Sequence, residues 1–244
     1  MPVRFKALII HFLGSVAVGL GALGLVFGLW YPPPLHLALG VSTVILLLLL
    51  VDMALGPLLT LLVYKPGKQS LKFDLAVIVV LQLTALSYGL WTVAQGRPTW
   101  LVFNVDRFDV VQAVDIDTRR LNEALPRYQV PAWSGPQWVA ALRPSDIERR
   151  NEILFEAVQG GSDIAQRPEL YRDLVLVAEQ MQARARTLSS LSQFNDSAVV
   201  ADILASWPKA TGWLPLMARV QPMVVLLTGD NTTVLAIVPL RPWL

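Results

Sequence analysis

Three long apolar runs near the N-terminus constrain the fold more than any other feature of the sequence. Between Ala7 and Leu50 no Asp, Glu, Lys or Arg occurs. The first run covers residues 7–30, and at a rise of about 1.5 Å per residue such a helix crosses a hydrocarbon core roughly 30 Å thick. Two further runs, at about 38–64 and 75–93, are also long enough to span. The sequence therefore predicts three transmembrane helices.

A cleaved signal peptide is the other interpretation of the first run, since Arg4 and Lys6 form a basic region before it. The run is longer than the apolar part of a signal peptide, and Trp30 is followed by Tyr31 and three prolines, which form a poor cleavage site. We therefore expect a spanning helix. The Tyr31 to Pro34 segment is expected to be a stiff connector outside the membrane.

The distribution of basic residues predicts the topology. Lys65, Lys68 and Lys72 lie between the second and third runs, whereas the link between the first two runs has no Lys or Arg. Because basic loops stay in the cytoplasm, we expect the N-terminus inside and the chain after the third helix outside. In a bacterial envelope this corresponds to a multi-pass protein of the inner (cytoplasmic) membrane, in contact with lipid, with a periplasmic C-terminal domain.

Residues 98–244 have the charge density of a soluble domain, so we divide the chain into a membrane module, 1–97, and a periplasmic α+β domain, 98–244. Strands are expected within 100–111, bent near Asp106. A capping-box pattern at Ser145 predicts a helix with Ile147, Leu154 and Val158 on one face. A longer helix is expected from Pro168, and a hairpin at 224–238 is expected to pair with the first strand.

Several kinds of chemistry find no support in the composition. Cysteine is absent, and the only histidines are His11 and His36, both in the membrane part. Basic residues do not cluster on a soluble face, which argues against a nucleic-acid partner. Phosphate-binding loops and the common hydrolase and metalloprotease motifs are also missing. We therefore predict no enzymatic activity, no cofactor and no metal site.

Asp52 is the least expected residue, because a carboxyl near the middle of an apolar span costs at least about 2.5 kcal/mol unless it is protonated or partnered. Gln82 on the third helix is at a comparable depth, so one hypothesis is a hydrogen bond between the two helices. A second is that Asp52 receives a polar group of a bound transmembrane partner. A third is that the protein is a small transporter or proton-coupled component that uses Asp52.

Two further features suggest helix contacts. Gly56 and Pro57 follow Asp52 by one turn, where proline can kink the helix and expose carbonyl groups. The first helix carries small residues at spacings of four that let another helix approach closely, and the candidates are Ser15, Gly19, Gly24 and Gly28. Packing within the chain and a groove for another protein's helix both account for these residues.

The membrane residues resemble the TfpX/TfpZ family of type IV pilin accessory proteins over roughly residues 1–110. The resemblance is carried by Trp30 to Pro32, Val51 to Leu61, Leu71 to Ile78, Tyr88 to Leu90 and Arg97-Pro98. Shorter stretches of the C-terminal part also look like the family, namely Asp106 to Phe108, Gly160 to Gln166, Leu214 to Leu216 and Leu240 to Trp243.

The resemblance implies an inner-membrane protein of Gram-negative bacteria that assists its own major pilin and influences pilin stability or delivery to the pilus assembly machinery. It implies no catalytic residues. In this interpretation the pilin helix is held in the bilayer by Asp52, Gly56, Pro57 and Gln82 together with the small residues of the first helix, while the external domain recognises the pilin head.

Overall fold

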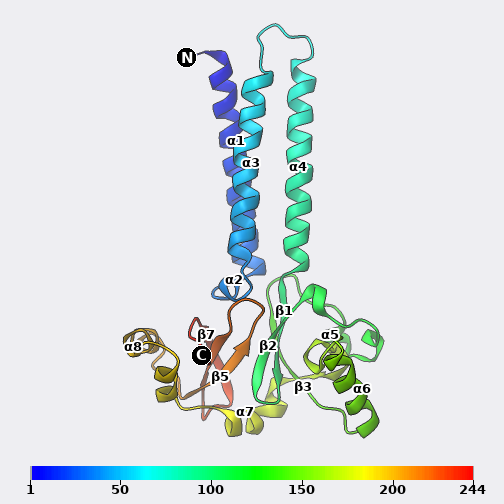
Figure 1. Ribbon diagram of the computed structural model, residues 1–244, viewed down its shortest axis with the longest axis vertical. Coiled ribbons are helices and arrows are strands. Elements are labelled where there is room, and N and C mark those ends of the chain that lie inside the picture. The colour runs from blue at the N-terminus through cyan, green and yellow to red at the C-terminus, as the bar shows by residue number, and fades with distance from the viewer. Residues whose placement is uncertain (1, 244) are drawn as a thin grey trace. The chain divides into compact units, whose positions relative to one another are not determined.

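The computed structural model describes residues 2–243 and divides into two compact units. One unit contains Gly40–Gly96 together with the residues before Tyr31. The other contains Tyr31–Leu39 together with the residues from Arg97 onward. A module of apolar helices and a domain of helices and strands were expected, and both are present (Figure 1).

Three long helices form the first unit. Their bounds are α1 Val3–Leu25, which continues as a π-helical turn over Val26–Trp30, α3 Val41–Val63 and α4 Leu71–Gln95. By length and composition all three can cross a membrane, as predicted. α1 begins earlier than expected, and α4 extends beyond the expected run at both ends. The reason is that polar residues such as Arg4, Lys72 and Gln95 continue the helical backbone.

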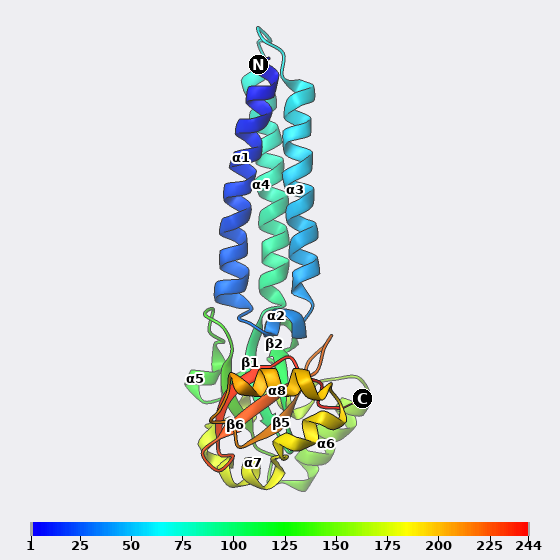
Figure 2. The same cartoon turned by 90° about the vertical axis from the view of Figure 1, so that its left-hand side faces the viewer.

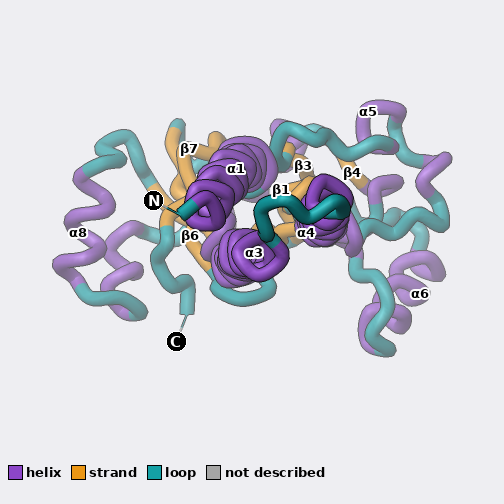
Figure 3. Tube along the Cα trace, turned by 90° about the horizontal axis from the view of Figure 1, so that it is seen from above, coloured by secondary structure: helices purple, strands orange, loops and turns teal. Residues whose placement is uncertain are grey.

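Figure 2 shows the three helices running side by side along their whole length. α3 is the central helix of this unit, since it packs against both α1 and α4 (Figure 3). Small residues allow these contacts. Ser15 and Gly19 of α1 are buried, and a Cβ added at Gly19 would lie 3.6 Å from Leu49. At the other interface a Cβ added at Gly56 would lie 2.2 Å from the Gln82 amide, so a side chain there would displace that amide.

The connector between α1 and α3 is part of the second unit and not a free external turn. Residues Leu35–Ala38 form the short helix α2, and both end residues are buried in the core of the domain. The backbone oxygen of Ala38 accepts hydrogen bonds from the amides of Val220 and Gln221, each at 3.1 Å. The boundary at residue 97 therefore omits one segment of the domain, because apolar residues inside the connector complete its core.

A seven-stranded mixed sheet organises the second unit, in the order β4-β3-β1-β2-β5-β6-β7. The bounds are β1 Pro98–Asn104, β2 Arg107–Gln112, β3 Gln137–Ala141, β4 Tyr171–Arg172, β5 Gly212–Met217, β6 Met223–Thr228 and β7 Thr233–Val238. The β1–β2 hairpin turns at Val105 and Asp106, as predicted. The β6–β7 hairpin does not pair with β1, because β2 and β5 lie between them, so that expectation was wrong.

Apolar residues pack on both faces of the sheet. Leu101 and Phe103 of β1 enter one cluster, which α2 and α7 (Ala178–Arg184) complete. Trp100 and Val102 point to the opposite face, as alternation along a strand requires, and pack with residues of α5 (Pro126–Gln129) and α6 (Ile147–Val158). A third cluster joins α8 (Ser197–Ala205) to β5, β6 and β7. The domain is therefore a sheet covered on both sides.

The helix expected from Pro168 is wrong. Residues 168–193 instead form 3-10 turns, the two-residue strand β4 and the short helix α7. Tyr171 is fully buried, pairs with Ala141 on the sheet and donates its hydroxyl to the Ala165 carbonyl at 2.6 Å. Leu170 packs on one face of the sheet and Met181 on the other, so the apolar stripe serves two clusters and cannot lie along one straight helix.

The predicted helix α6 exists, but its apolar stripe faces outward. Ile147, Leu154 and Val158 are 63%, 60% and 78% exposed, whereas Ile153 is buried. The N-cap is Asp146, whose carboxylate accepts the backbone amides of Glu148 and Arg149, and not Ser145. Ion pairs explain the orientation, since Arg149 and Glu156 on the inner side bind carboxylate and guanidinium groups of the domain.

A four-residue ion network joins α6 to the loops beneath it. Arg119 contacts Asp117 at 2.6 Å and Glu156 at 2.8 Å, and the buried guanidinium of Arg167 contacts the same two carboxylates. Hydrogen bonds from Arg119 lower the pKa of Asp117 to about 2 and, with a further bond from Arg167, lower the pKa of Glu156 to about 2. Both carboxylates therefore stabilise the fold in their ionised form.

This network predicts the acid sensitivity of the domain. A carboxyl with a lowered pKa in the folded state contributes stability above its unfolded-state pKa of about 4 and loses it as the pH falls toward about 2. The free energy of unfolding of the full chain should therefore be flat from pH 7 to about 5 and fall between about pH 4 and 2. Urea unfolding at each pH measures it. Asp117→Asn should make that decrease smaller. An unchanged decrease of the unfolding free energy at low pH in this variant would show that the ion network is not its cause.

Candidate functional site

A polar cluster lies among the three apolar helices. The Gln82 amide nitrogen donates to the Asp52 backbone oxygen at 2.9 Å and to its carboxylate Oδ1 at 3.2 Å. The amide oxygen of Gln82 is 2.7 Å from Nε2 of His11, and Nδ1 of His11 is 2.5 Å from the Thr60 hydroxyl. His11 comes from α1, Asp52 and Thr60 from α3, and Gln82 from α4. The cluster thus links all three helices.

The hydrogen-bond directions within this cluster follow from its chemistry. Since the Gln82 amide oxygen can only accept, Nε2 of His11 carries the proton in that contact. In a neutral imidazole the other nitrogen then accepts from the Thr60 hydroxyl. Every polar group that Gln82 contributes has a partner, which is the requirement for burial in hydrocarbon.

The structure brings Asp52 and Gln82 together, and the hydrogen bond expected between them is present. Gly56 makes it possible, because a side chain at that position would occupy the space of the Gln82 amide. Pro57 is buried within α3, which continues past it to Val63. His11 and Thr60 were not predicted as members. A histidine inside a charge-free run was the available signal, since it also needs partners there.

Asp52 is only half-buried, and its second carboxylate oxygen makes no hydrogen bond among residues 2–243. An ionisable group in an apolar helix long enough to span a membrane, with a free acceptor, is a candidate contact for a polar group of another molecule. The hydrogen bond from Gln82 to Asp52, which we call the internal clamp, is therefore compatible with a partner contact, because the two use different oxygens of the same carboxylate.

The small residues of α1 lie on two different faces. Ser15 and Gly19 face α3 and are buried. Gly24 and Gly28 are exposed, and a Cβ added at either would have nothing within 4 Å. They belong to a face that advances by alternating steps of three and four residues, which we call the open glycine face; it consists of Gly14, Ala17, Gly21, Gly24 and Gly28. At 3.6 residues per turn it lies on the far side of α1 from the residues that pack on α3.

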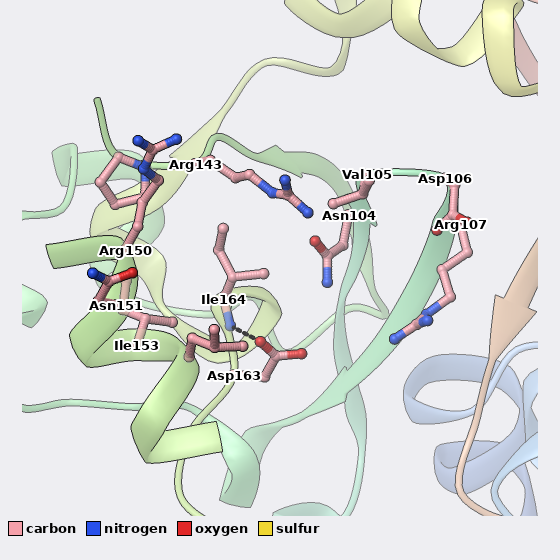
Figure 4. Close-up of a pocket in the computed structure, with 12 residues that line it drawn as sticks. Asn104, Val105, Asp106, Arg107, Arg143, Arg150, Asn151, Ile153, Asp163 and Ile164 are labelled. Carbon is pink, nitrogen blue, oxygen red and sulfur yellow. Dashed lines mark hydrogen bonds between the residues drawn. The ribbon is translucent and has the colours of Figure 1, made fainter. Parts of the chain in front are cut away.

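The second unit has a pocket of about 500 Å³ between the β1–β2 turn and α6 (Figure 4). Asn104 is 6% exposed, and its side-chain oxygen lacks a hydrogen-bond partner among the described residues. Arg143 and Arg150 also line the pocket, and neither makes an ion pair within residues 2–243. Buried Ile153 and Ile164 supply its apolar part.

Two stretches that carry the family resemblance meet at this pocket. Asp106 and Arg107 come from the β1–β2 turn, and Asp163 and Ile164 come from the loop after α6. Arg107 binds Asp109 at 2.9 Å, and Asp163 accepts the Ile164 amide at 2.7 Å, so both side chains also hold their own loops in place. The pocket has the cationic, amide and apolar groups of a polar binding surface.

Metal binding has no obvious location in the part of the chain that is described. No group of three or more His, Cys, Asp or Glu side chains is placed to hold an ion within residues 2–243. The absence of enzymatic activity and of a cofactor stays a prediction.

Comparisons with known proteins give the family. Residues 1–47 match the family described as fimbrial assembly protein FimB. A fimbrial assembly protein of serogroup E1 from Dichelobacter nodosus is 33% identical over 189 residues, which is 76% of this chain and 73% of that protein. The serogroup I protein of the same organism is 33% identical over 74% of this chain and 70% of its own length.

A third relative, from serogroups C1 and C2, is 33% identical over 47% of this chain and 89% of its own length. No solved structure matches the chain. The relatives fit a pilin accessory role, while the narrower TfpX/TfpZ assignment stays a prediction. Similarity over more than two thirds of two relatives, together with the family match of residues 1–47, shows that this chain belongs to the fimbrial assembly protein family.

Proposed function

We propose that the protein is an accessory factor or chaperone of the inner membrane that binds the major subunit of a type IV pilus and modulates its stability and assembly. The relatives support a role in fimbrial assembly. The subunit as the direct partner is inferred from the family resemblance and from the surfaces described above. The topology has the N-terminus in the cytoplasm and the sheet domain in the periplasm.

The open glycine face of α1 is the observation that carries this proposal. Within the described chain it contacts no other helix, although its glycines would permit an approach between backbones. In a bilayer, helices associate through such close packing and not through the hydrophobic effect, because lipid is as apolar as the side chains. The face therefore suits a single apolar helix, which is the membrane anchor that the resemblance implies for a pilin.

The polar cluster and the domain pocket have supporting roles in the proposal. Asp52 offers its free carboxylate oxygen to a polar or cationic group of the incoming helix, while Gln82 holds the other oxygen. The pocket with Asn104, Arg143 and Arg150 supplies a contact for the globular head of the subunit.

Enlarging the open glycine face should block the partner without disturbing the bundle. Gly24→Leu and Gly28→Leu add side chains where nothing lies within 4 Å, so the unfolding temperature should stay unchanged. Capture of the co-expressed subunit from solubilised membranes should fall at least about tenfold, or about 1.4 kcal/mol. Val80→Leu, at a 60% exposed residue of the different helix α4, is the control. Undiminished capture in both glycine variants would contradict the proposed surface.

Two substitutions at Asp52 separate its structural role from a role toward the partner. Asp52→Asn keeps an acceptor for Gln82 and removes the charge, whereas Asp52→Leu removes both. We expect Asp52→Leu to lower the unfolding temperature, and Asp52→Asn to preserve it while reducing capture of the subunit about threefold to tenfold. Equal capture by the wild type and Asp52→Asn would restrict the residue to the internal clamp.

The alternative function, a small transporter or proton-coupled component, uses the same carboxyl. The hydrogen-bonded series His11, Gln82 and Asp52 is the observation that favours it. Proton or ion flux in proteoliposomes that is abolished by Asp52→Asn would support this function, and the absence of flux would exclude it.

The topology can be tested because the chain has no cysteine. In intact cells a membrane-impermeant maleimide should label Ser189→Cys in the domain and leave Gln69→Cys in the α3–α4 loop unlabelled. Both positions are exposed, so lysed cells should show labelling of both variants. The reverse pattern in intact cells would overturn the proposed orientation.

A further inference from the structure

The last strand of the sheet has a free edge. β7 pairs with β6 alone, and no backbone hydrogen bond other than those to β6 involves Thr233–Ile237 in the described chain. In an antiparallel ladder every second residue aims its N–H and C=O away from the neighbouring strand. The outer side of β7 therefore presents a row of unused donors and acceptors.

This edge lacks most of the features that protect sheet edges. The strand has the sequence Thr-Val-Leu-Ala-Ile-Val, without a charge, a proline or a glycine. Natural edge strands are usually short, charged, interrupted by proline or covered by another element. A bulge near Leu235 is the single protective feature in β7. An uncharged edge of this kind invites another strand to pair with it.

A pocket of about 330 Å³ runs beside the edge. Four consecutive β7 residues, Val234 to Ile237, line one side of it, so the pocket follows the backbone of the strand and not only one of its faces. Pro32, Pro33 and the segment Ser134 to Pro136 form the opposite wall. Leu35, Leu101 and Trp138 complete the lining, which contains no charged residue.

We propose that the free edge of β7 is a strand-addition site that takes an extended, uncharged segment of the pilus subunit. Main-chain hydrogen bonds to β7 supply affinity, and alternate side chains of the segment enter the pocket toward Leu35 and Trp138. That the added segment belongs to the pilus subunit rests on the function proposed above. That β7 can accept an added strand rests on the edge and the pocket alone.

The lining determines which segment fits. A charged side chain in this pocket would lose water without gaining a counter-ion, so residues that point inward must be uncharged. The opposite wall argues against a second folded copy of this chain. A second copy would have to bring its own β6 and covering helices up to the wall of Pro32, Pro33 and Ser134 to Pro136, whereas an extended segment brings a single strand.

Amide hydrogen exchange on the full chain, with and without the co-expressed subunit, tests this site. In the complex, amides of residues 233–238 should exchange at least about tenfold more slowly than in the protein alone. Ala236→Pro and Ile237→Pro form a matched pair, because neighbouring amides of a strand point to opposite sides. One substitution removes a bond to β6, and the other removes only an outward donor. The variant that keeps the wild-type unfolding temperature should capture less subunit and lose the protection.

The outcomes distinguish this site from the proposed function. Capture of the subunit by the wild type with unchanged exchange in 233–238 would overturn the strand-addition site and leave the function intact. Failure of the wild type to capture the subunit at all would overturn both. Slower exchange that depends on the concentration of this chain alone would assign the edge to a second copy and overturn the proposed occupant.

Discussion

Polar side chains among apolar helices need partners within the protein, and Gln82 bonds to side chains of both other helices. Its amide nitrogen is bound by Asp52 and its amide oxygen by His11, whose second nitrogen is bound by Thr60. Apolar side chains give little preference for one helix register over another in lipid, whereas these hydrogen bonds form in a single alignment. The hydrogen bonds therefore favour one depth and rotation of α1, α3 and α4 relative to one another, in addition to the packing of α3 on both other helices.

Glycine and the polar cluster depend on each other. The Gln82 amide reaches the backbone of α3 because Gly56 has no side chain, and α1 lies close enough to α3 because Ser15 and Gly19 are small. The same kind of residue has the opposite role on the open glycine face, where no helix of this chain uses the space. Small residues thus account both for packing within the bundle and for the surface that we assign to the subunit.

Much of the unit of three apolar helices could be predicted from the sequence, because long uninterrupted apolar runs leave few structural choices. Long apolar runs must be helices, and the depth of Asp52 and Gln82 predicted their contact. The sheet domain was harder, because tertiary contacts override local patterns there. The stripe from Leu170 to Met181 has a helical spacing, yet burial of Tyr171 at the sheet divides it between two faces. The outward apolar face of α6 follows from ion pairs on its other side, which no local pattern reveals.

The position of α2 has a consequence for how the chain can be divided. Leu35 and Ala38 are almost fully buried among residues of β1, β5 and β6, which lie more than sixty positions later in the sequence. Burial of a leucine side chain contributes about 2 kcal/mol, a sizeable share of the stability of one domain. A fragment that starts at Arg97 would lack this helix and expose the apolar surface beneath it. The domain is therefore built from two separate segments of the polypeptide. The chain between α1 and α3 passes through the first of these segments, which contains α2.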